Sequence, residues 1–261
     1  MWHEFGVSSH RNSNTVCSVL HPVLEGNELF FTSDAAHVIK KIQSQLLNSI
    51  DFTLTYATVW HHGLPSSKLK LEHVRAVVEH DYEKELKIHI SKGHFTKMKV
   101  GIAVQFFKES PAAIRCLIRE KVLEPEAETT AWFLELIAKW YKLMSSRHPS
   151  VALSCRDMAK YHAALHTLRL ALETIQSMQM GSTSQWKPSQ AGLMIAMTVV
   201  LRLQVILLKT DDYKFFLAGR LLQECLEKLF SVVHQRKPVP NAYDLKCALQ
   251  LVCVSQFCTR Q

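Results

Sequence analysis

Two carboxylates far apart in the chain stand in settings that suit metal-dependent chemistry. Asp34 follows the apolar run at residues 29–32 and precedes His37 by one helical turn, whereas Glu227 lies in the helical pattern of residues 220–230. Carboxylate oxygens are the ligands that Mg²⁺ prefers, and two divalent ions can activate an attacking hydroxyl and stabilise a leaving oxygen. His37 could orient the Asp34 carboxylate or approach a phosphate.

Each of these residues also has an ordinary structural interpretation. Asp is a common N-cap where a strand turns into a helix, and the residues around Asp34 alone favour that role. His37 could equally be a half-buried residue on a helix surface. Glu227 could be a solvated residue on a helix where Glu224 and Lys228 pair.

The elements around Asp34 predict a strand, a short turn and a helix. Residues 29–32 form a short apolar run bounded by charge, which is typical of a buried strand. Helical spacing of apolar residues follows Asp34, at Val38, Ile39, Ile42, Leu46 and Leu47.

The sequence pattern predicts helices over almost all of the rest of the chain. We expect a loop at residues 58–67, where His61 and His62 form a polar pair, and we expect Trp132 and Trp140 in the core. Helices are predicted at 71–86, 97–117, 128–144, 158–178, 191–208, 213–233 and from Tyr243. The fold class is therefore α/β and mostly helical, with an all-helical insertion between the strand–helix unit and the acidic helix.

Composition places the chain among ordinary globular proteins with a basic surface. Hydrophobic residues make up 48% and charged residues 21% of the 261, so extensive disorder is not expected. The formal net charge of +8 suits a polyanionic partner such as DNA.

Neither the cysteines nor the apolar segments indicate a secreted or membrane protein. The 7 cysteines form no CxxC pair, which favours buried reduced thiols over a zinc site built from Cys247, Cys253 and Cys258. The N-terminus lacks the apolar core of a signal peptide. Residues 191–208 include Arg202 and Gln204, so we expect a buried helix there and no membrane partner.

Several segments, taken in order, resemble the P-element-type transposases, a family whose members often carry an N-terminal THAP zinc finger. The segments are 1–7 (MWHEFGV), 31–40 (FTSDAAHVIK), 97–107 (KMKVGIAVQFF), 130–135 (TAWFLE) with 146–147 (SR), and 220–230 (RLLQECLEKLF). The resemblance implies an RNase H-like domain interrupted by a helical GTP-binding insertion. It implies RNase H-like parts at residues 1–54 and 191–261, around an insertion at 55–190.

The resemblance also implies a site and a chemistry. The family cuts and joins DNA with two Asp, one Glu and magnesium, so Asp34 and Glu227 are implied as catalytic metal ligands. His37 is implied as the histidine of the D-x-x-H motif. Lys99 and Val100 match nucleotide-contacting positions, whereas Lys142 and Ser145 replace the Asp and Asn of the family and weaken the expectation of GTP specificity.

The resemblance further implies a nuclear protein bound to transposon DNA, and leaves oligomerisation open. The first catalytic Asp of the family lies upstream of the segment that begins here at Met1. We therefore expect an N-terminally truncated, catalytically incomplete transposase. Two alternatives stay open: a longer active transposase, and a host-adopted helical interaction protein without catalysis.

Overall fold

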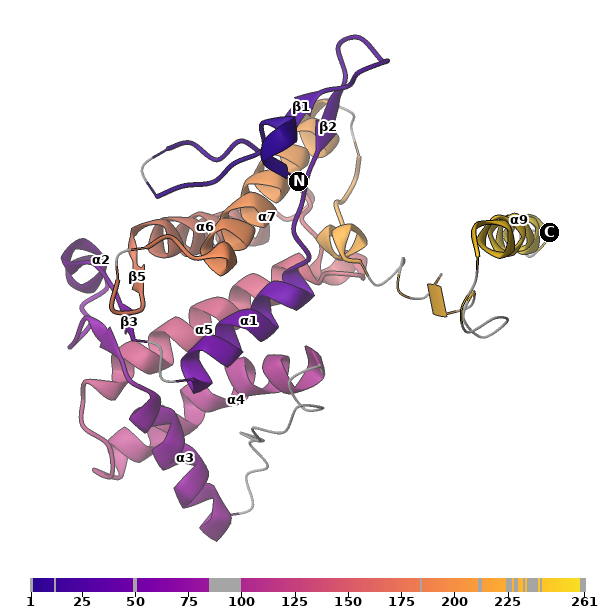
Figure 1. The fold of residues 1–261 in the computed structure, drawn as a ribbon. Coiled ribbons are helices and arrows are strands. Elements are labelled where there is room, and N and C mark those ends of the chain that lie inside the picture. Colours follow the sequence, from indigo (N-terminus) through magenta and orange to yellow (C-terminus); the bar gives the residue numbers. More distant parts are fainter. Residues whose placement is uncertain are drawn as a thin grey trace. The chain divides into compact units, whose positions relative to one another are not determined.

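The computed structural model describes the chain except for residues 1, 12, 49–50, 85–99, 184, 211–212, 224–226, 228–229, 232, 234–238, 240 and 259–261. It forms two compact units, Met1–Leu221 and Leu222–Gln261, which are described separately. The described residues are mostly helical, with two small sheets, as Figure 1 shows. The predicted domain boundaries at residues 54 and 190 stay a prediction.

A short hairpin covers one side of the first unit. It follows a 3-10 helix, Trp2–Phe5, and pairs β1 (Ser18–Leu20) with β2 (Glu28–Phe30) in antiparallel register. The expected strand at 29–32 thus exists, but the expectation that it is buried is wrong, because Leu29 is 38% exposed. A two-stranded hairpin buries only one face; this one covers α7 (Pro188–Val205) and leaves the other face to solvent.

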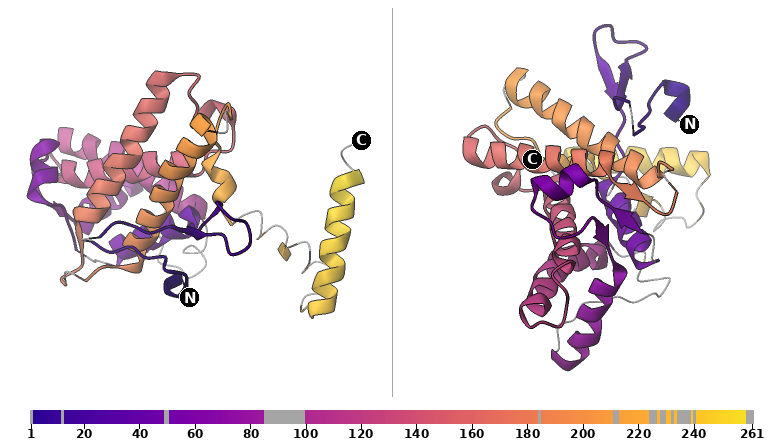
Figure 2. Two further views of the ribbon diagram at one scale, coloured as in Figure 1. Left: turned by 90° about the horizontal axis from the view of Figure 1, so that it is seen from above. Right: turned by 90° about the vertical axis from the view of Figure 1, so that its left-hand side faces the viewer.

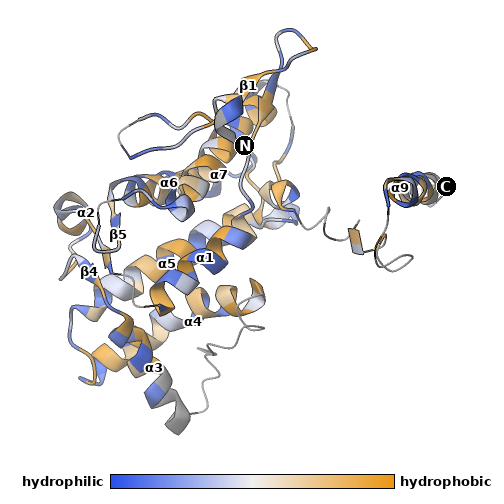
Figure 3. Ribbon diagram, viewed as in Figure 1, coloured by the Kyte–Doolittle hydropathy of each residue, from blue (hydrophilic) through white to orange (hydrophobic). Residues whose placement is uncertain are grey.

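Helix α1 (Ala35–Leu47) begins where the sequence predicts a strand-to-helix turn. Val38, Ile39, Ile42 and Leu46 form its buried face, while Leu47 is half-buried. In Figure 3, apolar and polar residues alternate along α1, as a helix with one buried face requires. That face packs on α4 (Val100–Arg119), α5 (Ala127–Met144) and α7.

Helices α4 and α5 form the central pair, with α3 (Leu71–Lys84) packed on α4. Trp140 is fully buried on α5, as expected, but Trp132 is only half-buried. The Trp132 ring instead lies 4.8 Å from the ring of His62. The loop expected at 58–67 begins late, because α2 (Tyr56–His61) is helical from its Thr55 N-cap.

Helices α6 (Met158–Ser177) and α7 run side by side, as Figures 1 and 2 show. The segment Pro188–Thr210, which adds the π-helical turn Ile206–Thr210 to α7, is long and apolar enough to cross a membrane. Buried residues make up 56% of its most apolar window, and α7 contacts both α1 and α6. These contacts are those of a core helix.

A three-stranded antiparallel sheet joins distant parts of the first unit. Its strands are β3 (Phe52–Thr53), β4 (Lys68–Leu69) and β5 (Gln179–Met180), in the order β4-β3-β5. Phe52 pairs with Leu69 on one side and with Met180 on the other. The chain that continues from β3 through β4 therefore returns to the sheet in β5, the strand on the other side of β3.

The helix predicted at 213–233 does not begin at Tyr213. Phe216 forms an isolated bridge with Leu153, and a short 3-10 helix, Ala218–Leu221, follows. These residues end the first unit by packing on the loop after α5. The second unit contains α9 (Ala242–Cys258), which confirms the predicted final helix.

Candidate functional site

Asp34 is the N-cap of α1, as the sequence predicts. Its backbone is extended, with φ −70° and ψ 113°, and its Oδ2 accepts the backbone N–H of His37 at 3.1 Å. The Nδ1 of the His37 ring also pairs with Oδ2. Asp34 is 8% exposed, whereas the His37 side chain is 52% exposed. The carboxylate is therefore buried, and the imidazole that pairs with it reaches the surface.

A close helix crossing fixes the start of α1. Ser33 Oγ donates to the backbone oxygen of Gly192 in α7. A Cβ at Gly192 would lie 3.2 Å from Val38 Cγ2 and 3.3 Å from Ser33 Oγ, so glycine allows this approach. Farther along α1, Ser189 Oγ donates to Gln45 Oε1 at 2.9 Å. The position of Asp34 is therefore set by α7 as well as by its own helix.

The end of α5 adds two groups to the surroundings of Asp34. Burial raises the pKa of the Tyr141 hydroxyl, and the Asp34 carboxylate raises this pKa further, while the Arg147 guanidinium lowers it. The Tyr141 hydroxyl therefore lies within the electrostatic reach of both Asp34 and Arg147. Sequence analysis did not identify Tyr141, because more than a hundred residues separate it from Asp34 and only the packing of α1 on α5 joins them.

Glu227 belongs to the second unit, whereas Asp34 and His37 belong to the first. It is helical and exposed, and its backbone N–H donates to the Gln223 oxygen at 2.9 Å. Because the two units are described separately, the pairing of Asp34 with Glu227 stays a prediction.

The residues that the structure describes do not complete a magnesium site. Among them, no group of three or more His, Cys, Asp or Glu side chains gathers to hold a metal. Asp34 already uses Oδ2 for the helix cap and for His37. A two-metal centre needs several carboxylates at once, so the described donors do not fit one and support no metal-dependent step.

A cavity of about 540 Å³ lies beside the start of α1, where Ser33 and His37 line it and Asp34 does not; we call it the α1–α7 cavity. It is lined by residues 7–10, by the first turns of α1, and by residues between Trp186 and Ile195. His37 and Lys41 line it from α1. A single cavity thus combines the Trp186 ring with His37 and Lys41, and His37 in turn pairs with the Asp34 carboxylate.

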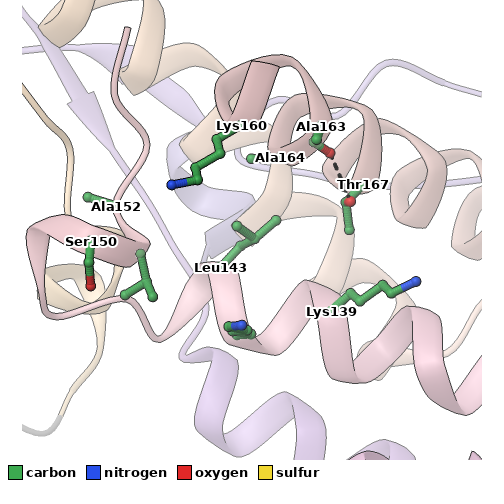
Figure 4. A pocket seen from close by; sticks show the side chains of 10 residues that line it. Lys139, Leu143, Ser150, Ala152, Lys160, Ala163, Ala164 and Thr167 are labelled. Carbon is green, nitrogen blue, oxygen red and sulfur yellow. Dashed lines mark hydrogen bonds between the residues drawn. The ribbon is translucent and has the colours of Figure 1, made fainter. Parts of the chain in front are cut away.

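A second cavity, of about 340 Å³, lies between the end of α5 and the start of α6. Lys139 and Lys160 lie on opposite sides of Leu143 in it, as Figure 4 shows. Lys142 lines this cavity, but Val100, at the start of α4, does not. Lys99 lies outside the described residues, so the expected nucleotide contact of Lys99 and Val100 stays a prediction.

A comparison with solved structures gives a likeness of fold. No protein-family model matches the chain, and no curated protein matches it. Among solved structures, it resembles the Drosophila P element transposase strand transfer complex, with a TM-score of 0.74 and 20% sequence identity. The alignment covers 95% of this chain and 55% of the transposase chain. The chain therefore shares a transposase-like fold and spans about half the length of that transposase.

Proposed function

We propose that this chain is a DNA-binding protein of the P-element transposase type that does not carry out strand transfer by itself. The observation that carries the proposal is the fold likeness over 95% of the chain. Asp34 and His37 support it, because they occupy a strand-to-helix junction in the arrangement that the D-x-x-H motif implies. Nuclear location follows from the same proposal.

The charge of the chain supports DNA as the partner. A formal net charge of +8 attracts phosphate backbones, and binding of this kind releases counterions and weakens as salt rises. In the lining of the α1–α7 cavity, Lys41 lies one helical turn beyond His37 of the motif on α1, which adds a basic side chain to this surface. Magnesium and GTP enter the proposal only through the resemblance of sequence motifs.

The proposed lack of independent catalysis depends on how few metal ligands the described residues bring together. Removing even one group that stabilises a transition state costs roughly a hundred- to a thousandfold in rate. Asp34 alone is an incomplete donor set within the described part of the first unit. Even with Glu227, this chain would supply only two of the three carboxylates that the sequence resemblance implies.

The proposal is tested by binding and by chemistry on the 261-residue chain. We expect it to bind duplex DNA at about 50 mM salt, with an affinity that falls steeply by about 200 mM. We expect no cleavage or joining of DNA when Mg²⁺ is added. Absence of duplex binding at low salt would contradict the DNA partner. Strand transfer that is lost in both Asp34→Ala and Glu227→Ala would contradict the lack of catalysis.

One observation favours a second function, that of a helical interaction protein. Tyr56 and Trp60 stack on α2 with ring centroids 6.4 Å apart, and both are 77% exposed. Exposed aromatic residues of this kind are enriched where proteins bind each other. A protein partner whose binding is lost in Trp60→Ala but kept in Asp34→Ala would favour this function over the first.

A further inference from the structure

We propose that the α1–α7 cavity binds one unpaired nucleotide of a DNA strand, with the base against Trp186 and the phosphate near His37 and Lys41. This inference rests on the proposed function, because it specifies how DNA meets the Asp34 region. The cavity, the indole and the two basic side chains all belong to the first unit.

The cavity has the size and lining of a ligand site. Its volume of about 540 Å³ falls within the range of small-ligand pockets. Val7, Val38 and Ile195 give it apolar walls, and Ser8 and Ser9 add polar groups from the N-terminal segment. Apolar walls with a few polar groups suit a molecule that has one flat apolar part and one charged part.

Trp186 provides the surface for the base. It is half-buried, and the guanidinium of Arg11 lies 6.0 Å from its ring centroid. Arg11 is itself held, because it donates to the Met178 oxygen at 3.2 Å. Aromatic side chains bind bases of any sequence by stacking, since every base has a π-face. The indole is thus supported in place before a ligand arrives.

The indole nitrogen adds a second reason to place a ligand here. Trp186 Nε1 is buried and makes no hydrogen bond among the described residues. Indole N–H is only a donor, and a buried unpaired donor is costly. A base or sugar oxygen that reaches this N–H would therefore supply a hydrogen bond that the described residues do not.

His37 and Lys41 provide the surface for the phosphate. They lie four residues apart on α1, so their side chains share one face of the helix. The His37 ring is oriented by the pairing of Nδ1 with Asp34, which leaves the opposite ring edge available to a ligand. Lys41 is exposed and can neutralise a phosphate without first breaking a buried contact.

The geometry favours an unpaired nucleotide over a duplex. A base inside a duplex is stacked on both faces, and an enzyme reaches it only after the base leaves the stack. Trp186 and the apolar walls line a cavity, so a base must enter it to meet the ring. Single-stranded or flipped-out nucleotides are therefore the ligands that fit.

The first experiment measures the anisotropy of a labelled short homothymidine strand and of the same strand without bases. We expect Trp186→Ala to weaken binding of the intact strand by roughly tenfold and to leave the abasic strand unchanged. Trp60→Ala is the matched control, because Trp60 is also a tryptophan but is exposed on α2. Equal weakening of both strands, or an equal effect of Trp60→Ala, would overturn the site.

Three further variants control for misfolding and test the phosphate contact. Trp186→Phe keeps an aromatic ring and should retain most of the binding, even if Trp186→Ala proves unstable. Lys41→Ala should reduce the salt slope by about 0.7 on both strands, whereas Lys108→Ala on α4 should not. An unchanged slope in Lys41→Ala would overturn the phosphate contact.

Free nucleotides distinguish a DNA site from a nucleotide-cofactor site. We expect thymidine monophosphate and GTP to compete only weakly with the strand, because a single nucleotide lacks the neighbouring phosphates. Strong competition by GTP that depends on Trp186 would overturn the DNA assignment. Duplex binding together with single-strand binding that Trp186→Ala leaves unchanged would overturn this site alone, whereas failure to bind duplex and strand would overturn the proposed function as well.

Discussion

At the scale of single residues, Asp34 has two separable roles. As a helix cap it needs only an oxygen that accepts the His37 N–H, and as a candidate metal ligand it needs a negative charge. Asparagine keeps the first property and lacks the second. The pair of substitutions Asp34→Asn and Asp34→Ala therefore separates the structural interpretation from the functional one.

We expect Asp34→Ala to lower the free energy of unfolding by about 1 kcal/mol, because the α1 cap is lost. Asp34→Asn should be nearly as stable as the parent chain. Urea unfolding followed by circular dichroism measures both values. Equal destabilisation by Asn and Ala would show that the charge of Asp34, which acts on Tyr141, matters more than the cap.

Gly219 is a second residue whose role depends on its neighbours. A Cβ there would lie 2.6 Å from the Ser146 oxygen and 2.9 Å from the Ser145 oxygen, both of them backbone atoms. The Gly219 N–H donates to the same Ser146 oxygen at 3.0 Å, and the Ala218 N–H donates to Ser146 Oγ at 3.2 Å. Only glycine permits this close contact between the loop after α5 and the end of the first unit.

We expect Gly219→Ala to destabilise the chain by about 2 kcal/mol, because the backbone must shift away from Ser146. Gly101→Ala is the matched control, since a Cβ at Gly101 in α4 meets nothing within 4 Å. That change should stabilise the chain by up to about 1 kcal/mol. Chemical denaturation compares the two variants, and similar effects from both would contradict the close contact.

Residues that act through their sequence neighbours could be predicted from the sequence, whereas residues that act through tertiary contacts could not. The Asp34 cap follows from neighbours within four positions, and so does the spacing of His37. Trp186 and Tyr141 reach the same region from residues far along the chain, through contacts of α7 and α5 with α1. No local pattern marks such residues, because their role is set by tertiary packing.

At the scale of elements, an ion network joins α4 to α5. Arg115 pairs with Glu128 at 2.9 Å and with Glu135 at 2.7 Å, and Lys139 pairs with Glu135 at 2.7 Å. The hydrogen bond from Lys139 lowers the pKa of Glu135, burial opposes that shift, and Arg115 lowers the pKa further. The folded state thus binds a proton at Glu135 less readily than the unfolded state does.

This shift predicts a pH dependence of stability. A carboxyl group with a lowered pKa stabilises the folded state above its ordinary pKa, and this contribution is lost as the pH falls below about 4.5. We expect Glu135→Gln to reduce the loss of stability between neutral and acidic pH. Glu124→Gln, at an exposed loop position, is the control. Thermal unfolding across this pH range measures the difference, and identical profiles for parent and Glu135→Gln would contradict it.

Helices were the elements that the sequence predicted well, because one apolar face repeats over several turns in α1, α4 and α5. Short elements were predicted less well. The strand at β2 has only three residues, and its exposure is set by what it covers. The predicted helix at 213–233 has helical composition, but Phe216 near its start forms an isolated bridge with Leu153.

At the scale of the whole molecule, the hairpin and α7 bring together residues almost two hundred positions apart. Cys17 is fully buried in a cluster with Val7, Ile195 and Val199. Burial raises the pKa of the Cys17 thiol, so its reactive thiolate forms at higher pH than usual, although Arg202 opposes this shift. Cys155, by contrast, is exposed.

We expect a thiol reagent at neutral pH to label Cys155 at once and Cys17 only slowly, as the hairpin separates from α7. Mass spectrometry of digested protein follows each cysteine separately. Arg202→Ala should accelerate labelling of Cys17, because Arg202 binds Glu28 at 2.8 Å and lies over the Phe30 ring. Rapid labelling of Cys17 in the parent chain would contradict the packing of the hairpin on α7.

Because β3 and β5 are neighbours in one sheet, the length of the chain between them can change. Thr53 faces Gln179 across the sheet, so the long stretch between them departs and returns at almost the same point. Residues can be gained or lost inside that stretch without displacing either strand, as in a protein loop that tolerates insertions. The constraint on such changes lies in the helices of the stretch that pack on helices outside it: α4 and α5 pack against α1, on which Ile39 and Ile42 are fully buried, and α6 packs against α7.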